Sequence, residues 1–232
     1  MTAGSVGRNS GKTRVLIVDD HPLVRHGLMQ LINAENDMEV FAQAGGAAET
    51  LEIIGKTPPD VAILDLSLQE GSGLELIRQI RNCDESIRIL VSSMHDESLY
   101  AERAIHAGAL GYINKQEAMD RIIDAIRQVL RGKVYLSERM KDRMLLGLTG
   151  PHAEEGNSPI KTLSNREIEV FERIGRGEST RKIADQFHLS VKTVETYREN
   201  IKRKLNLETN LELIRHAVEW VLEQDRGEAP PP

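Results

Sequence analysis

A strand that ends on a carboxylate is predicted at Val61-Ala62-Ile63-Leu64-Asp65-Leu66-Ser67. Its four consecutive apolar residues, without polar alternation, are typical of a strand buried on both faces of a parallel sheet. Such a strand brings the residue after it to the carboxyl edge of the sheet, where open α/β folds bind their ligands. We therefore expect the Asp65 carboxylate to lie at the functional edge of a domain.

A second apolar run, Val15-Leu16-Ile17-Val18, also ends on carboxylates, those of Asp19 and Asp20. If the two strands are neighbours, three carboxylates meet at one edge of the sheet. Like charges at this separation repel one another unless a cation lies among them, and carboxylate oxygens suit Mg²⁺. The sequence therefore predicts a Mg²⁺ site.

Strands and helices alternate from residue 14 to about residue 131. After the strand at 15–18, the apolar pattern predicts strands at 39–42, 61–64, 87–91 and 111–113. Helices are predicted to follow these strands, at 22–32, 47–54, 73–80, 97–106 and 122–130. Five βα units in sequence imply a doubly wound parallel sheet with right-handed crossovers, and hence an α/β domain over residues 14–133.

The chain changes character after this domain. Residues 134–161 are predicted to form a linker, with a helix at 137–148 that Ser137 would cap. Residues 162–225 carry helical patterns and no strand pattern, so we expect a second, all-α domain there. The polar ends of the chain, 1–13 and 226–232, are predicted to be disordered.

The second domain has the spacing of a helix-turn-helix. Ser164 and Glu167 are placed as a capping box before an apolar run. A helix at about 180–187 is followed by a three-residue turn, 188–190, and a helix at 191–205. In the last helix, about 209–222, an apolar stripe is expected to be mostly core and consists of Leu211, Ile214, Val218 and Val221.

Charge is divided unequally between the domains. The whole chain has a formal net charge of −6, and residues 14–133 hold 12 basic and 19 acidic side chains. In contrast, the stretch from Ser190 to Leu205 holds five Lys or Arg and two Glu, a charge of +3. Basic and hydroxyl side chains can bind DNA phosphates, and Glu can accept from cytosine in the major groove. A solvated helix face would show the same pattern, so charge alone leaves DNA binding open.

Five side chains at predicted strand ends have the chemistry of phosphoryl transfer, which needs a nucleophilic oxygen, a divalent metal and a cation. Asp65 can be the nucleophile, and Asp19 with Asp20 can hold Mg²⁺. Lys115 can neutralise charge on the phosphoryl oxygens, and Ser93 can donate a hydrogen bond. By contrast, His21 and His95 have no zinc-ligand spacing, and we expect them to be ordinary loop histidines.

Residues 14–131 resemble the receiver domain of two-component response regulators. The resemblance rests on Val18-Asp19-Asp20-His21-Pro22, Leu64-Asp65-Leu66, Ser93-Met94-His95-Asp96 and the stretch from Gly108 to Lys115. It implies a flavodoxin-like sheet of order 2-1-3-4-5 and phosphorylation of Asp65 by a sensor histidine kinase. It also implies metal ligation by Asp19, Asp20, Asp65 and the Ser67 carbonyl, and a switch pair, Ser93 and Tyr112. Gln69-Glu70 departs from the family, which usually has a proline there.

Residues 160–222 resemble the LuxR-type helix-turn-helix of the NarL/FixJ regulators. Leu163-Ser164-Asn165-Arg166-Glu167, Leu189-Ser190 and Lys192-Thr193-Val194-Glu195 are among the matching stretches. The resemblance implies that base edges are approached by Glu195, Thr196 and Glu199. The phosphate contacts that it implies are Lys192, Thr193, Arg198, Asn200, Lys202 and Arg203.

Composition restricts the other classes of function. Cys83 is the only cysteine, so an intramolecular disulfide is excluded and a reducing compartment is indicated. No apolar run approaches the ~20 residues of a membrane helix, and no apolar signal core is seen near residue 1, so we expect a cytoplasmic protein without a membrane partner. Aromatic residues make up 3% of the chain, too few for base-stacking platforms.

We therefore expect a transcriptional response regulator that is not an enzyme acting on an outside substrate, although it could catalyse its own phosphorylation and dephosphorylation. The expected partners are a sensor histidine kinase, double-stranded promoter DNA, a second copy of the chain after activation and, as a further candidate, RNA polymerase. Three alternatives stay open: a phosphorylation-independent DNA-binding regulator, a protein-interaction phosphorelay module, and a Mg²⁺-dependent phosphotransfer or phosphatase enzyme. The short βα units leave no insertion for a substrate pocket, which disfavours the enzyme.

Overall fold

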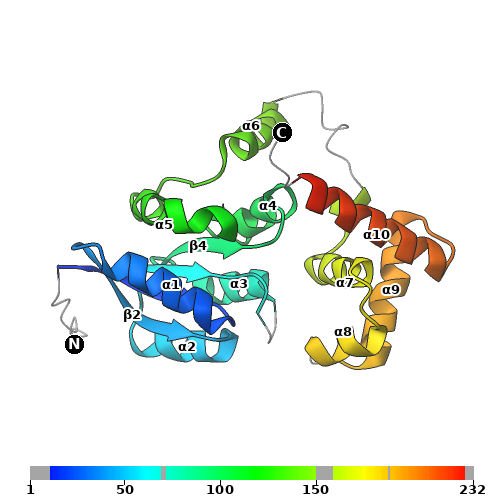
Figure 1. Cartoon of the computed structure of the whole chain (residues 1–232), viewed down its shortest axis with the longest axis horizontal. Helices are drawn as coiled ribbons and strands as arrows, with labels where there is room; N and C mark the ends of the chain where they lie inside the picture. The colour runs from blue at the N-terminus through cyan, green and yellow to red at the C-terminus, as the bar shows by residue number, and fades with distance from the viewer. Residues whose placement is uncertain (1–10, 69–71, 150–158, 188, 228–232) are drawn as a thin grey trace.

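Five parallel strands form the sheet of the N-terminal domain, in the order β2-β1-β3-β4-β5 (Figure 1). The computed structural model describes residues 11–68, 72–149, 159–187 and 189–227. The strands are β1 (Thr13–Val18), β2 (Met38–Ala44), β3 (Val61–Leu64), β4 (Arg88–Ser93) and β5 (Gly111–Asn114). The predicted doubly wound sheet and its strand order are confirmed.

Helices cover both faces of this sheet because successive strand side chains point to opposite sides. Val15 and Ile17 of β1 pack with α1 (Pro22–Asn33) and α5 (Lys115–Leu130). Leu16 and Val18 point to the other face, which is covered by α2 (Ala47–Lys56), α3 (Gly73–Cys83) and α4 (Glu97–Ala107). All four residues of β3 are buried, as expected for a central parallel strand.

The segment after α5 adds to the edge of the sheet. Tyr135 accepts a backbone hydrogen bond from Tyr112 and donates one to Leu110, so it lies beside β5. Helix α6 (Glu138–Thr149) follows, in the region where a linker helix is expected over 137–148. Ser137 Oγ accepts from the Met140 amide, and the Ser137 amide donates to Glu97 of α4. The start of α6 is thereby attached to the α/β domain.

Four α-helices and a short 3₁₀ helix (Pro159–Thr162) form the described part of the C-terminal domain: α7 (Asn165–Gly175), α8 (Thr180–Gln186), α9 (Val191–Leu205) and α10 (Asn210–Gly227). The predicted capping box at Ser164 and Glu167 is present at the start of α7. Serine side chains also cap α8 and α9, so the boundaries of the helix-turn-helix follow local sequence signals. Residue 188 of the turn and the chain ends, 1–10 and 228–232, lie outside the described residues.

The prediction for the buried face of the last helix is only partly right: Val221 is buried and Val218 is half-buried, but the other two predicted positions are exposed. Leu211 and Ile214 are 76% and 42% exposed, and the buried stripe of α10 is instead Leu213, Ala217, Trp220 and Val221. The reason is a close approach to α7, where a Cβ on Gly175 would lie 2.3 Å from the Ala217 carbonyl oxygen. The face of α10 that carries the small residue Ala217 packs inward, and Leu211 and Ile214 beside it stay exposed.

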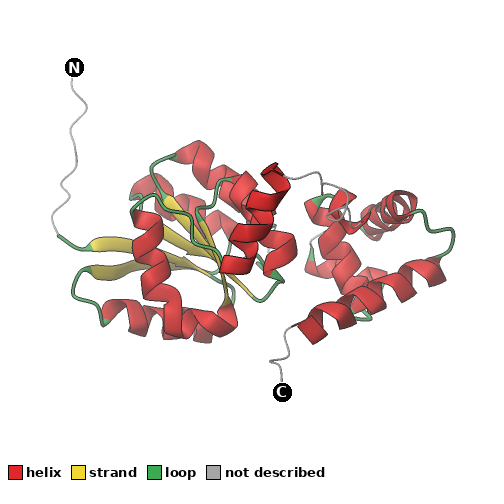
Figure 2. Ribbon diagram, turned by 90° about the horizontal axis from the view of Figure 1, so that it is seen from above, coloured by secondary structure: helices red, strands yellow, loops and turns green. Residues whose placement is uncertain are grey.

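Figures 1 and 2 show the helical domain beside the α/β domain. Among the described helices, none has the length and apolar composition needed to cross a membrane. The short polar contacts between the domains come from α7 and the residues just before it, as described below. Helix α9 makes none of these contacts and keeps an exposed polar face.

Candidate phosphorylation site and nucleic-acid interface

Three carboxylates meet at the carboxyl edge of the sheet, as predicted from the strand ends. Strands β1 and β3 are paired, with Val18 opposite Leu64, so the residues after them are neighbours. Ligand atoms of Asp19, Asp20, His21 and Asp65 all lie within 4.8 Å of one another. Asp19 and Asp65 are each 2% exposed, which places two negative charges in a nearly water-free environment.

Lys115 supplies the compensating positive charge. Its ammonium lies 2.7 Å from an oxygen of Asp19 and 2.7 Å from Oδ2 of Asp65. Burial alone would lower the pKa of Lys115, but the two carboxylates outweigh burial and raise that pKa. Lys115 is therefore charged at neutral pH and joins the ends of β1, β3 and β5.

The remaining oxygen of Asp65 indicates what the site can bind. Asp65 Oδ1 is buried and has no hydrogen-bond partner among the described residues. An unpaired buried carboxylate oxygen is costly unless a donor or a cation occupies the space beside it. The carboxylate oxygens of Asp19, Asp20 and Asp65 are donors that suit a hard divalent cation such as Mg²⁺.

His21 contributes to the same cluster, although it was expected to be an ordinary loop histidine. Its amide donates to Asp19 Oδ1 at 2.8 Å, and its Nδ1 lies 2.6 Å from an oxygen of Asp20. The ring itself is exposed, so His21 closes the outer side of the carboxylate group. A cavity of about 540 Å³ lies beyond it, lined by Asp20, Ser67 and, from the helical domain, Arg173 and Phe187.

The predicted switch residues, Ser93 and Tyr112, are both buried next to this edge. Ser93 Oγ accepts a hydrogen bond from the His95 amide at 3.3 Å. The Tyr112 hydroxyl donates to the His95 carbonyl at 2.7 Å. Burial raises the pKa of Tyr112 well above its ordinary value, and a hydrogen bond with Ser93 opposes this rise only in part. The Tyr112 ring is buried and so points inward, and its raised pKa keeps the hydroxyl neutral at pH 7.

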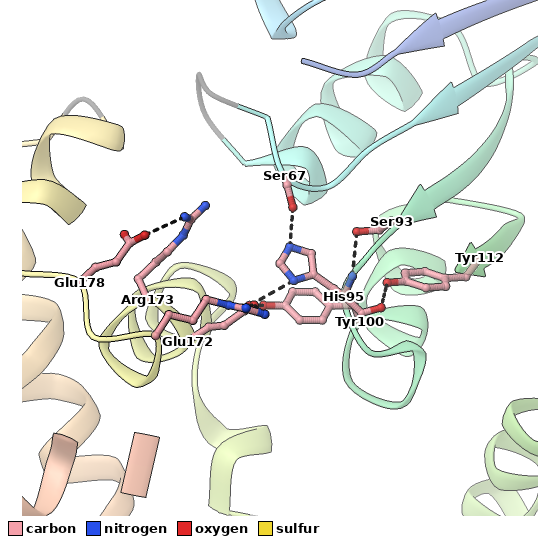
Figure 3. A network of polar contacts seen from close by, with 9 residues as sticks. Ser67, Ser93, His95, Tyr100, Tyr112, Glu172, Arg173 and Glu178 are labelled. Atoms are coloured by element: carbon pink, nitrogen blue, oxygen red, sulfur yellow. Dashed lines mark hydrogen bonds and ion pairs between the residues drawn. The ribbon is translucent and has the colours of Figure 1, made fainter. Parts of the chain in front are cut away.

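His95 extends this group of contacts to the helical domain (Figure 3). Its Nε2 lies 2.8 Å from Ser67 Oγ, and its Nδ1 lies 3.1 Å from Oε2 of Glu172 on α7. The imidazole stacks on the Tyr100 ring, with 4.5 Å between the centroids and 24° between the planes. Sequence reasoning missed this role, because nothing in the pattern around His95 indicates a partner 77 positions away.

Electrostatics favours a charged Glu172 at this contact. Burial would raise the pKa of the Glu172 carboxyl, but His95 and Arg176 outweigh burial and lower that pKa to about 2. Burial also opposes protonation of His95, but Glu172 and then Asp65 outweigh it and raise the pKa of the imidazole. The Tyr100 hydroxyl, whose pKa burial raises, donates to Glu172 Oε2 at 3.4 Å.

The residues proposed for DNA contact lie on α9 with unequal exposure. Val194 and Ile201 are buried against the core, so the opposite face of the helix is exposed. Arg198 is largely buried, with its guanidinium 3.8 Å from Glu195, and Lys202 pairs with Glu199 at 2.9 Å. The exposed residues are Lys192, Glu195, Thr196, Glu199 and Arg203, and the half-buried ones are Thr193, Asn200 and Lys202.

Two family models match the two domains. The response regulator receiver domain matches residues 15–127, and the luxR family of bacterial regulatory proteins matches residues 161–217. The oxygen regulatory protein NreC of Staphylococcus carnosus is 35% identical over 209 residues, 88% of this chain and 96% of its own. This chain belongs to the two-component response regulators of the NarL/FixJ family. A further relative is the nitrate/nitrite response regulator protein homolog of Haemophilus influenzae, 34% identical over 86% of this chain and 93% of its own.

Solved structures agree with the fold of this response regulator. A LuxR-family two-component response regulator from Aurantimonas sp. SI85-9A1 is 35% identical and matches 58% of this chain and 96% of its own, with a TM-score of 0.54. RcsB of Salmonella typhimurium matches 90% of this chain and 98% of its own with a TM-score of 0.68, at 22% identity, and shows the fold alone. The regulator is thus a receiver domain joined to a LuxR-type DNA-binding domain.

Proposed function

We propose that this response regulator binds promoter DNA under the control of phosphorylation at Asp65. One observation carries the proposal: Asp65 presents an unpaired buried oxygen beside Lys115 and two further carboxylates. This is the arrangement that a phosphoacceptor needs, since the nucleophile, the metal ligands and the neutralising cation are all present. The phosphodonor is a sensor histidine kinase, or a small acyl phosphate that enters by the cavity beside Asp20.

The side chains have distinct roles in this reaction. An oxygen of Asp65 forms a bond to phosphorus while the bond from phosphorus to the donor nitrogen breaks, and the donor imidazole leaves with the electron pair. Lys115 stabilises the charge of the phosphoryl oxygens, and Ser93 donates a hydrogen bond to them. Asp19, Asp20, Asp65 and the Ser67 carbonyl would hold Mg²⁺, which supplies further neutralisation of that charge. Hydrolysis of the acyl phosphate at the same site returns the protein to its resting state.

DNA is read by α9. Glu195, Thr196 and Glu199 face outward and are proposed to approach base edges. The proposed phosphate contacts are Lys192, Thr193, Asn200, Lys202 and Arg203, whereas Arg198, which the resemblance also implied, is largely buried beside Glu195 and is not among them. RcsB from Salmonella enterica serovar Typhimurium has been solved bound to promoter DNA in the presence of the phosphomimetic BeF₃⁻, which supports DNA binding by a protein of this fold. We place the regulator in the cytoplasm, where it acts as a dimer on DNA and where RNA polymerase is a further partner.

The test is an in vitro selection of random duplex DNA with Mg²⁺, with and without acetyl phosphate, for wild type and Asp65→Asn. We expect a two-fold-related sequence to be enriched for wild type with the donor, together with the mass increase of one phosphoryl group. Equal enrichment under all four conditions would favour a phosphorylation-independent DNA-binding regulator. No enrichment at all would contradict DNA binding and favour an interaction module.

The assignment of α9 has its own control. Lys192→Ala removes an exposed charge from the proposed phosphate contacts, whereas Lys141→Ala removes a charge from α6. Each lost phosphate contact should reduce the steepness of the slope of log K, the logarithm of the DNA association constant, against log salt concentration by about 0.9. We expect that reduction for Lys192→Ala and none for Lys141→Ala, measured by fluorescence anisotropy on the selected site. Equal slopes for the two variants would argue against α9 as the DNA-contacting helix.

A further inference from the structure

We infer that His95 is the positioning residue through which phosphorylation of Asp65 controls the docking of the DNA-binding domain on the receiver. The inference rests on the proposed function, because it takes Asp65 as the phosphoacceptor. It goes beyond that function by naming the side chain that joins the two events. The side chain of His95 contacts both domains, and its backbone contacts both proposed switch residues.

The side chain of His95 is held at both nitrogens. An ionised Glu172 can only accept hydrogen bonds, so the Nδ1 of His95 must carry the proton that it donates. Nε2 then faces Ser67 Oγ, only two residues after Asp65. One ring therefore links the loop that follows the phosphoacceptor to a buried carboxylate of the DNA-binding domain.

The backbone of His95 is held by the two residues that phosphorylation would move. The His95 amide donates to Ser93 Oγ, and its carbonyl accepts from the Tyr112 hydroxyl. A phosphoryl group on Asp65 offers new acceptor oxygens, and turning the Ser93 hydroxyl toward them removes the acceptor of the His95 amide. A shift of this backbone moves the imidazole away from Glu172. The docked state therefore loses its buried ionic contact when Asp65 is phosphorylated.

A second interdomain contact, made through other residues, provides the control. Arg103 of α4 donates to the Leu163 carbonyl at 3.0 Å and to Asn165 Oδ1 at 2.9 Å. Both acceptors belong to the DNA-binding domain, so these two hydrogen bonds do not involve Ser93, Tyr112 or His95. Arg103→Ala should therefore weaken docking but leave docking sensitive to phosphorylation of Asp65. Glu172→Gln should weaken docking and also make it insensitive to phosphorylation.

The experiment measures the distance between spin labels on native Cys83 in the receiver and on Arg215→Cys in α10, both exposed. Full-length protein is compared with and without Mg²⁺ and beryllium fluoride, a phosphoryl mimic. We expect the mimic to shift wild type from the docked distance to longer distances. Without the mimic, His95→Ala and Glu172→Gln should each lower the ratio of docked to undocked molecules roughly tenfold or more, as for loss of a hydrogen bond to a charged group.

The response to beryllium fluoride then distinguishes a contact that transmits phosphorylation from one that only stabilises the docked state. Arg103→Ala should still respond as wild type does, while His95→Ala and Glu172→Gln should show little further change. If the mimic changes that ratio by the same factor in Glu172→Gln as in wild type, His95 is not the coupling residue and the inference is overturned. Glu172→Gln keeps the side-chain shape, so this result is readable even if His95→Ala folds poorly.

Phosphorylation itself is followed by mass spectrometry with acetyl phosphate, so the two claims can fail separately. If Asp65 is phosphorylated but the docked distance of wild type is unchanged, the coupling through His95 is overturned and the proposed function stands. If Asp65 is not phosphorylated, the proposed function and this inference are both overturned.

Discussion

The carboxylates of Asp19, Asp20 and Asp65 lie together beside the ammonium of Lys115, so three negative charges face one positive charge. Without a divalent cation, Asp20→Asn should stabilise the receiver, because it removes one of three like charges. With Mg²⁺, wild type should instead be more stable than Asp20→Asn. At roughly a hundredfold excess over Kd, Mg²⁺ should stabilise wild type by about 2–3 kcal/mol, and Asp20→Asn should lose most of this gain.

Thermal unfolding with and without Mg²⁺ measures the effect. Asp124→Asn, which removes an exposed carboxylate from α5, is the matched control and should respond to Mg²⁺ as wild type does. A gain of the same size in Asp20→Asn and wild type would argue against Asp20 as a metal ligand.

Gly73 shows how one missing side chain positions Asp65. A Cβ at residue 73 would lie 2.5 Å from the Leu66 Cα and 2.8 Å from the Asp65 carbonyl oxygen, both backbone atoms. Since backbone cannot give way cheaply, we expect Gly73→Ala to destabilise the receiver by about 1–3 kcal/mol and to slow phosphorylation of Asp65. Chemical denaturation and the rate of acetyl phosphate modification measure the two effects.

Gly55→Ala is the control, because nothing lies within 4 Å of the Cβ added at that position in α2. That substitution should stabilise the receiver by about 0.4–1 kcal/mol through the unfolded chain, with phosphorylation unchanged. If Gly73→Ala and Gly55→Ala had similar effects on stability and on the phosphorylation rate, the close approach at Gly73 would not be what positions the loop after Asp65.

Among the helices, α7 depends on a cap that also ties it to α9. Glu167 accepts from the Ser164 amide at 2.7 Å, and the same oxygen lies 2.6 Å from Lys204 at the end of α9. Burial would raise the pKa of Glu167, but Lys204 and the Ser164 amide outweigh burial and lower it. We expect Glu167→Gln to destabilise the DNA-binding domain by about 1–2 kcal/mol at neutral pH.

The sign of the pH dependence follows from that lowered pKa. The stabilisation by Glu167 is present above its unfolded pKa of 4.5 and is lost as pH falls through the lower folded pKa. The difference between wild type and Glu167→Gln should therefore shrink in acid. Trp220, the only tryptophan, packs on Phe171 and reports unfolding of this domain by fluorescence. Glu219→Gln, at an exposed site, should have little effect at either pH.

For the whole molecule, the exposed stripe of α10 predicts where two copies meet. Leu211 is 76% exposed although it lies on a helix of the DNA-binding domain, and Ile214 and Leu222 are exposed with it. We expect Leu211→Glu to prevent dimer formation on DNA in the presence of beryllium fluoride, measured by light scattering after gel filtration. Leu23→Glu alters a leucine on α1 that is even more exposed, at 84%, and is expected to leave that dimer intact. If Leu23→Glu prevented the dimer and Leu211→Glu did not, the dimer contact would lie on the receiver.

Much of this fold could be predicted from sequence because its determinants are local. The apolar runs at 15–18 and 61–64 specify buried parallel strands, and a parallel sheet brings the residues after such strands to one edge. The sequence therefore predicts that Asp19 and Asp65 are neighbours, as they are in the structure. The capping box at Ser164 and Glu167 is likewise a signal within four residues, and α7 begins where it predicts.

The tertiary structure alone decided which apolar stripe of α10 is buried and what His95 contacts. The stripes through Leu211 and Leu213 are both apolar, and only the crossing of Gly175 over Ala217 selects one of them. The contact of His95 with Glu172 depends on how one domain lies against the other, which no periodicity encodes. Buried strands and helix caps are signalled locally in the sequence, whereas the connection between the phosphorylation site and the DNA-binding domain depends on packing between distant segments.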